Sequence, residues 1–207
     1  MKKLVIILSL LLLLTGCVTK PENSTTKPVT TTPSPSQPEG TTAPTTPATP
    51  VDSDSVGILE KIWGLYGDDD RFAVFGGSME HAVDGMPGAL DLTNSEEIVS
   101  KYLLPEAQIA NVKDAASLMH MMNGNIFTAA VVTLGDGADE ETLVKTWREA
   151  IRQNRWICGQ PDKLLMYHIG DQILMAFGST DAMRVFEAKT AEAFPDGKLL
   201  YSEAIIG

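Results

Sequence analysis

Cysteine, histidine and aromatic residues are scarce in this chain of 207 residues, which has two Cys, three His and 6% aromatic residues. Two cysteines cannot hold together a disulfide-rich miniprotein of this length. Basic residues are also few, at 16 against 27 acidic residues, and the formal net charge is -11. Because phosphate backbones are bound by clustered Lys and Arg, this balance excludes nucleic acid as the main partner.

No apolar run in the chain is long enough to cross a membrane. Residues 4–14 are apolar apart from Ser9, and they follow Lys2 and Lys3. As a helix this run spans roughly 16 Å, about half of a bilayer core. A basic start followed by a short apolar run is typical of a signal peptide.

The run ends in the sequence Leu14-Thr-Gly-Cys17, which resembles the lipobox of bacterial lipoproteins. The resemblance implies that the Cys17 thiol receives a diacylglycerol and that the chain is cut just before it. Residues 1–16 are then a signal peptide, and the mature protein is anchored through lipid on the extracytoplasmic face of the cell membrane. Two acyl chains suffice for lasting anchorage, whereas a single chain is marginal.

The stretch that follows Cys17 is rich in Thr and Pro. Residues 18–55 contain 11 Thr, 8 Pro and 5 Ser, and no aromatic residue. Pro removes a backbone donor and favours extended geometry, and the segment has too little apolar surface to repay the entropy of folding. We therefore expect residues 17–55 to form a disordered tether, of a composition that is compatible with O-glycosylation.

Residues 56–207 are expected to fold as one globular domain, because 152 residues can bury a substantial core. Residues 81–92 contain glycines and a proline and are expected to be irregular. Thr93 and Glu96 form a capping box for a helix that ends at Pro105. The other expected helices are 58–66, 139–154 and 181–194, and the expected strands are 72–75, 117–122, 126–134, 163–169, 172–177 and 198–205.

This order predicts an α+β fold, an antiparallel sheet with helices mainly on one face. Its second half has the strand, helix, hairpin, helix, strand order of the ferredoxin-like split βαβ fold. Gly170-Asp171 is a two-residue hairpin turn, which pairs Met166 with Met175 and places His168 opposite Ile173.

Methionine and histidine supply one candidate chemistry. His120, Met166, His168 and Met175 could offer thioether and imidazole ligands to Cu(I) outside the membrane. The strand face that carries Met166 and Met175 is otherwise apolar, and Met commonly fills gaps in cores. We therefore assign no metal ligand and no cofactor, and metal handling remains an alternative function.

No recognised catalytic motif is present, so we assign no catalytic residue and leave open whether the protein is an enzyme, with a non-enzymatic role favoured. A cell-wall or peptide hydrolase is a second alternative, which requires either a His close to Ser78 or Ser117 or a pair of carboxylates in a cleft. Cys158 lies between apolar neighbours, which predicts a buried and inert thiol, although an intermolecular disulfide is possible outside the cell.

Two further strings resemble a family. Residues 117–123 (SLMHMMN) and 156–161 (WICGQP) are similar to segments of uncharacterised surface lipoproteins of Gram-positive anaerobes. The resemblance implies a lipid-anchored extracytoplasmic domain, and it adds no site residue to Cys17. Together with the sequence organisation, it favours a non-enzymatic module that binds an extracellular ligand or protein.

Overall fold

The computed structural model describes residues 54–205, so the predictions for Cys17, the signal peptide and most of the tether lie outside the described residues. The helical segments are α1 (Asp54–Trp63), η1 (Met79–His81), α2 (Ser95–Glu97), η2 (Ile98–Tyr102), α3 (Glu106–Ile109), α4 (Glu140–Gln153) and α5 (Thr180–Ala193). The strands are β1 (Val74–Gly76), β2 (Val83–Asp84), β3 (Gly88–Ala89), β4 (Val112–His120), β5 (Phe127–Leu134), β6 (Lys163–Ile169), β7 (Gln172–Gly178) and β8 (Lys198–Ala204). None of the helices in this range is long and apolar enough to span a bilayer.

The strands form one antiparallel eight-stranded sheet in the order β2-β1-β4-β5-β7-β6-β8, with β3 paired to β4. The expected α+β class and antiparallel sheet are confirmed. The β6–β7 hairpin has the predicted register, because Met166 pairs with Met175 and His168 pairs with Ile173. Residues 81–92, expected to be irregular, contribute the two short strands β2 and β3.

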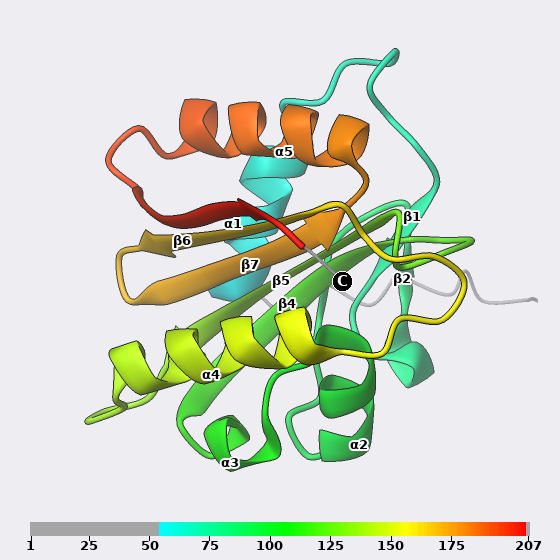
Figure 1. Cartoon of the computed structure of the whole chain (residues 1–207). Helices are drawn as coiled ribbons and strands as arrows, with labels where there is room; N and C mark the ends of the chain where they lie inside the picture. Colours follow the sequence, from blue (N-terminus) through cyan, green and yellow to red (C-terminus); the bar gives the residue numbers. More distant parts are fainter. Residues whose placement is uncertain (1–53, 206–207) are drawn as a thin grey trace, which may run out of the picture. The chain divides into compact units, whose positions relative to one another are not determined.

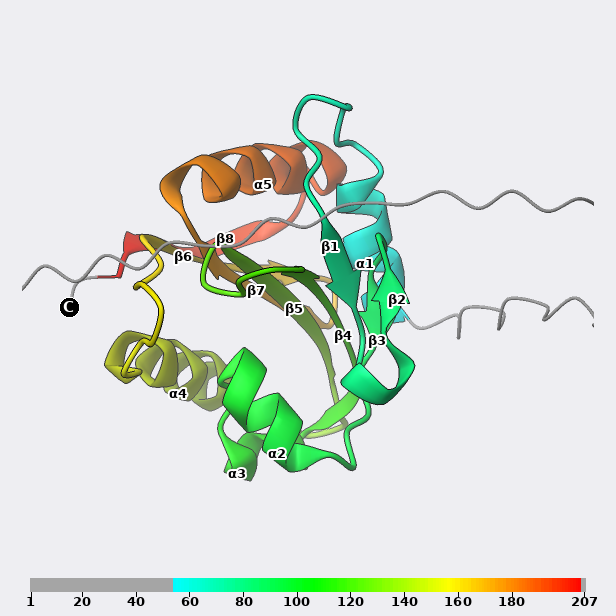
Figure 2. The same cartoon turned by 90° about the vertical axis from the view of Figure 1, so that its right-hand side faces the viewer.

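Helices cover both faces of the sheet, and the expectation that they lie mainly on one face is wrong. One apolar cluster joins α1 and α5 to the sheet, and Leu59, Ile62 and Phe186 are among its buried members. A second cluster joins α4 and η2 to the opposite face through residues such as Tyr102 and Trp147. Figures 1 and 2 show α5 and α4 on either side of the strands. The molecule therefore has three layers over residues 54–205.

The strand order explains why α4 and α5 lie on opposite faces. β5 and β6 are parallel with β7 between them, and β7 and β8 are parallel with β6 between them. Crossovers between parallel strands are right-handed. The crossovers from β5 to β6 and from β7 to β8 run in the same direction across the sheet, but β5 and β7, the strands from which they start, are antiparallel. The right-handed rule therefore places their two helices on opposite faces.

The ferredoxin-like arrangement is present only in the first of these units. In a ferredoxin-like sheet the last strand lies beside the first strand of the motif, which would be β5. Here β4 already pairs with that edge of β5, and β8 pairs with β6 instead. The expected strands 117–122 and 126–134 correspond to β4 and β5, and their pairing occupies the edge of β5 that a ferredoxin-like arrangement would leave for β8.

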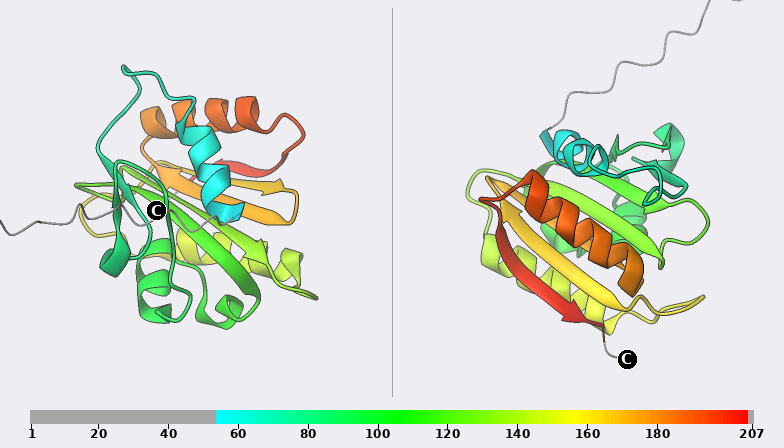
Figure 3. Two further views of the ribbon diagram at one scale, coloured as in Figure 1. Left: turned by 180° about the vertical axis from the view of Figure 1, so that it is seen from behind. Right: turned by 90° about the horizontal axis from the view of Figure 1, so that it is seen from above.

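The first helix begins inside the segment that we assigned to the tether. α1 starts at Asp54, and Ser55 is buried. The Ser55 hydroxyl lies 2.8 Å from Oγ1 of Thr133, and its backbone N–H donates to Asp114 over 3.1 Å. Asp54 and Ser55, which we assigned to the tether, therefore belong to the first helix of the described structure. Figure 3 shows α1 and α5 together over one face of the sheet, where the two helices contact each other.

The helix predicted to start at Thr93 is capped one residue later. The Asn94 side chain accepts from the backbone N–H of Glu97, and its amide donates to the Glu97 carboxylate. The Asn94 backbone N–H donates to the carbonyl of Asp91 and not to Glu97, so the predicted capping box is replaced by an Asn cap one residue later. After one turn the helix widens into the π-helix η2, which ends at Leu103 in the left-handed conformation, with φ 57°. A left-handed residue is a common helix terminator, although Leu rarely takes this role.

Candidate functional site

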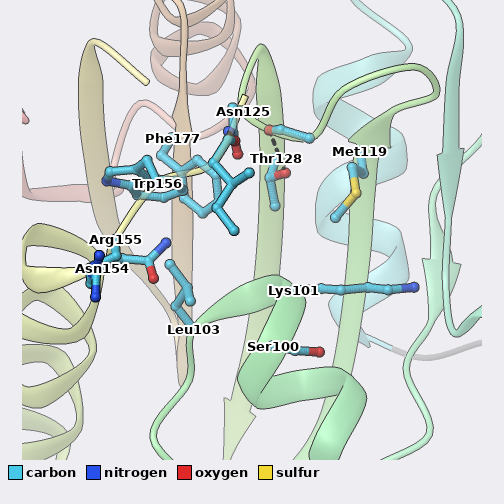
Figure 4. A pocket seen from close by; sticks show the side chains of 12 residues that line it. Ser100, Lys101, Leu103, Met119, Asn125, Thr128, Asn154, Arg155, Trp156 and Phe177 are labelled. Atoms are coloured by element: carbon cyan, nitrogen blue, oxygen red, sulfur yellow. Dashed lines mark hydrogen bonds between the residues drawn. The ribbon is translucent and has the colours of Figure 1, made fainter. Parts of the chain in front are cut away.

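A cavity of about 340 Å³ opens on the face of the sheet that carries α4 and η2 (Figure 4). Its floor is one row of the sheet. Met119 on β4 pairs with Thr128 on β5, which pairs with Phe177 on β7. All three residues are buried, and the Thr128 hydroxyl donates to the carbonyl of Gly124 over 2.9 Å. The floor therefore presents mainly apolar atoms.

The end of η2 forms one wall of the cavity through Ser100, Lys101 and Leu103. Figure 4 shows the Lys101 side chain running past Met119, away from the opposite wall. Its ammonium lies 3.0 Å from the carboxylate of Glu97. The aliphatic part of Lys101 lines the cavity, while its charge is already paired.

The opposite wall is the segment that follows α4, from Asn154 to Ile157. Trp156 meets Phe177 edge to face, with ring centroids 5.1 Å apart and an interplanar angle of 62°. The indole N–H of Trp156 is buried without a hydrogen-bond partner among the described residues, and it points away from Phe177 (Figure 4). Apolar contact with Phe177 is therefore what holds this ring in the wall.

The loop between β4 and β5 fastens this wall to the sheet. The Asn125 side-chain amide donates to the carbonyls of Ile157 and Gly159, each over 2.6 Å. Asn123 adds a longer bond of 3.4 Å to the carbonyl of Cys158. The Asn-Gly-Asn sequence of this loop, residues 123–125, thus positions the backbone that carries Trp156.

Besides the Trp156 indole, two polar side chains of the cavity have no partner within residues 54–205. They are Asn154, which is half-buried, and Arg155, which is exposed. Figure 4 shows the Asn154 amide directed across the cavity towards Leu103. None of the described residues that line the cavity is acidic, although the whole chain carries a net charge of -11. The cavity thus carries hydrogen-bond donors, on Asn154 and Arg155, that have no partner among the described residues, although the protein as a whole is acidic.

The four metal-ligand candidates do not meet at one place. Met166 and Met175 pair with each other and are fully buried in the cluster beneath α4. His168 lies near the turn of their hairpin, 2.6 Å from the carbonyl of Gly170 and 3.2 Å from the carboxylate of Glu140.

His120 lies towards the other face of the sheet, where its ring stacks on Phe72. Its Nδ1 accepts the backbone N–H groups of Met122 and Asn123. Each candidate thus has a separate role in packing or in a turn. In the described part of the chain, no three or more His, Cys, Asp or Glu residues are grouped so that they could hold a metal ion.

The serines considered as nucleophiles are both buried and hydrogen-bonded. Ser117 Oγ accepts the backbone N–H of Gly77 over 3.0 Å and lies 2.9 Å from the hydroxyl of Tyr102. Burial raises the pKa of Tyr102 to about 12, although the hydrogen bond with Ser117 opposes that shift. Ser78 Oγ accepts the backbone N–H of Asp91 over 2.7 Å. These hydroxyls join β1 and the loop that follows it to the rest of the domain.

Cys158 is exposed, so the predicted burial is wrong. The prediction assumed that the apolar neighbours of Cys158 would be buried, but Ile157 is itself 80% exposed. Residues 157–160 are all exposed, and Cys158 adopts a left-handed conformation with φ 64°. The thiol therefore projects from a surface turn beside the cavity wall.

The sequence did not indicate the residues of this cavity as a site. They come from four segments far apart in the chain, namely residues 100–103, 119–128, 154–157 and Phe177. Residues 117–123 and 156–161 were singled out only for their resemblance to other lipoproteins, and the sheet register and the course of the chain after α4 bring parts of both to the cavity.

Comparisons with known proteins add no family to this description. No family model, no curated protein and no solved structure matches the chain. The cavity is therefore interpreted from its own residues.

Proposed function

We propose that this protein is a lipid-anchored module on the extracytoplasmic face of the cell membrane, which acts by binding rather than by catalysis. The cavity between η2 and the segment after α4 is its binding site. The observation that carries the binding role is the unpaired Asn154 and Arg155 beside the aromatic wall of Trp156 and Phe177. Ligand sites commonly combine a mainly apolar cavity with a few polar groups that orient the ligand.

The anchor is proposed from the sequence alone. A basic start, a short apolar run and the lipobox ending at Cys17 follow one another in the order that lipoprotein processing requires. Residues 18–53 would then be the spacer between the membrane and the domain, because α1 begins at Asp54. A spacer of this length allows the domain to reach ligands at some distance from the membrane surface.

The two alternative functions have less support in residues 54–205. The side chains that a hydrolase would use, Ser78 and Ser117, are buried and hydrogen-bonded to the backbone. The thioethers of Met166 and Met175 are enclosed in the core, on the other side of the sheet from His120. Binding at the cavity uses groups that are open and without partners.

The anchor is tested by metabolic labelling with an alkyne analogue of palmitate in the native host. We expect the full-length protein to take up the label, and we expect globomycin to block its maturation. A Cys17→Ser variant is the matched control and should remain unlabelled. Wild-type protein that matures normally without any label would contradict the proposed anchor.

A further inference from the structure

The cavity has one free positive charge, on Arg155, and one free neutral amide, on Asn154. Lys101 is paired with Glu97, so Arg155 is the only unpaired charge among the described residues that line the cavity. Asn154 immediately precedes it and directs its amide into the cavity (Figure 4). Both residues line the cavity, and a guanidinium together with an amide donor suits a single planar anion, since Arg pairs with carboxylates through two parallel hydrogen bonds. One available positive charge matches a carboxylate better than a doubly charged phosphate.

The rest of the cavity is suited to an apolar group of modest size. Trp156 and Phe177 present two rings, and Leu103 and Met119 complete the apolar lining. Aromatic side chains attract further rings in stacked or edge-to-face arrangements. A volume of about 340 Å³ is at the small end of ligand sites, which favours a compact ring over a long chain.

We infer that the cavity binds an aromatic carboxylate, with the ring between Leu103 and Trp156 and the carboxylate on Arg155 and Asn154. This inference rests on the proposed binding function and specifies its ligand class. The same chemistry is offered by a free aromatic acid and by a peptide that ends in an aromatic residue. The overall acidity of the protein opposes anions in general, so the pairing with Arg155 would have to supply the selectivity.

The test measures binding of matched probes to the mature chain in lipid nanodiscs by saturation-transfer NMR, with empty nanodiscs as the blank. N-acetylphenylalanine carries the ring and the carboxylate, whereas N-acetylphenylalanine amide has the same ring without the charge. N-acetylalanine carries the charge without the ring. The tripeptide Ala-Ala-Phe represents the end of a peptide.

Two arginine variants separate the cavity from general charge effects. Arg155→Gln removes the proposed anion partner, and because Arg155 is exposed and unpaired within the described residues, the fold should tolerate the change. Arg184→Gln is the matched control, since Arg184 is also exposed but lies on α5, across the sheet. Trp156→Leu removes the ring while it keeps an apolar side chain.

We expect N-acetylphenylalanine to bind at least about tenfold more tightly than either its amide or N-acetylalanine. Arg155→Gln should weaken binding of the acid by about tenfold and leave the amide unchanged, whereas Arg184→Gln should change neither. Trp156→Leu should weaken both aromatic probes. Tighter binding of the tripeptide than of the free acid would indicate a peptide end as the source, and weaker binding would indicate a small molecule.

Equal binding of acid and amide would overturn the inference. If that binding still depended on Trp156, the proposed binding function would survive. The inference would also be overturned if the Arg155→Gln variant bound N-acetylphenylalanine as tightly as the wild type does, or if no probe showed saturation transfer. The palmitate experiment decides the anchor independently of all these outcomes.

Discussion

At the scale of single residues, the hydroxyl pair of Tyr102 and Ser117 connects the cavity wall to the sheet. Tyr102 is the last residue of η2, and Ser117 lies in the middle of β4. The same Ser117 hydroxyl accepts the backbone N–H of Gly77, and Trp147 donates to the Tyr102 carbonyl over 2.8 Å. All of these groups are buried, so each depends on its partner for hydrogen bonding.

Replacing Ser117 with Ala should therefore destabilise the fold. The change leaves the Gly77 N–H without its buried acceptor and leaves the Tyr102 hydroxyl with only a long 3.5 Å bond to the Gly77 carbonyl, which costs about 1–3 kcal/mol. Urea denaturation measures the free energy of unfolding. Ser100→Ala is the matched control, because the Ser100 hydroxyl is exposed and donates only to the carbonyl of Glu97, so that its loss should have little effect. Equal stability of wild type and Ser117→Ala would contradict this description of the buried pair.

Residue-level prediction from the sequence succeeded for packing and failed for the site. Met166 and Met175 are core residues facing each other, as their hairpin position predicted. Arg155 and Asn154 were not recognised as candidate site residues, because the argument for them is that their side chains line a cavity without a hydrogen-bond partner among the described residues. The absence of a hydrogen-bond partner can be seen only in the folded structure and not in the sequence.

At the scale of secondary structure elements, the contact between α5, β6 and β8 depends on a carboxylate. Glu187 on α5 accepts from Lys163 on β6 and from Ser202 on β8. Partial burial raises the pKa of Glu187, but the hydrogen bonds from Lys163 and Ser202 outweigh it, so the pKa lies below its ordinary value.

A lowered pKa in the folded state means that Glu187 stabilises the fold above its ordinary pKa of about 4.3. This contribution is lost as the pH falls through the lower pKa of the folded state. Glu187→Gln should cost under about 1 kcal/mol at neutral pH and nothing once the carboxylate is protonated. Urea denaturation at neutral pH, and again at a pH at which the Glu187 carboxylate is protonated, measures the free energy of unfolding of wild type and variant. Glu192→Gln, on the exposed side of the same helix, is the control, and a pH-independent cost for Glu187→Gln would contradict the assignment.

The elements themselves were largely predictable where apolar periodicity and turn residues agree. Both ends of α4 and of α5 lie within one residue of their expected bounds. Apolar spacing carried this prediction, and the buried face of α5 consists of Met183, Phe186, Thr190 and Ala193. The π-helix η2 was not predicted, because nothing in its composition distinguishes it from an α-helix. The second helical layer was not predicted either, because it follows from where β4 pairs.

At the scale of the whole molecule, the charge is distributed unevenly. Residues 1–55 contain four basic and four acidic residues, so the entire net charge of -11 belongs to the remainder of the chain. An acidic domain on a lipid anchor would be repelled by an anionic membrane surface, and the proposed tether would allow it to stand away from that surface. This organisation would leave the cavity open to ligands outside the cell.

Labelling of Cys158 on intact cells tests this account most directly. Cys158 is exposed, and the chain's only other cysteine is the proposed lipidation site, Cys17. After mild reduction, a maleimide that cannot cross the cytoplasmic membrane should label the protein on intact cells, and Cys158→Ser should abolish the label. Labelling that appears only after the cells are lysed would place the domain inside and contradict the account.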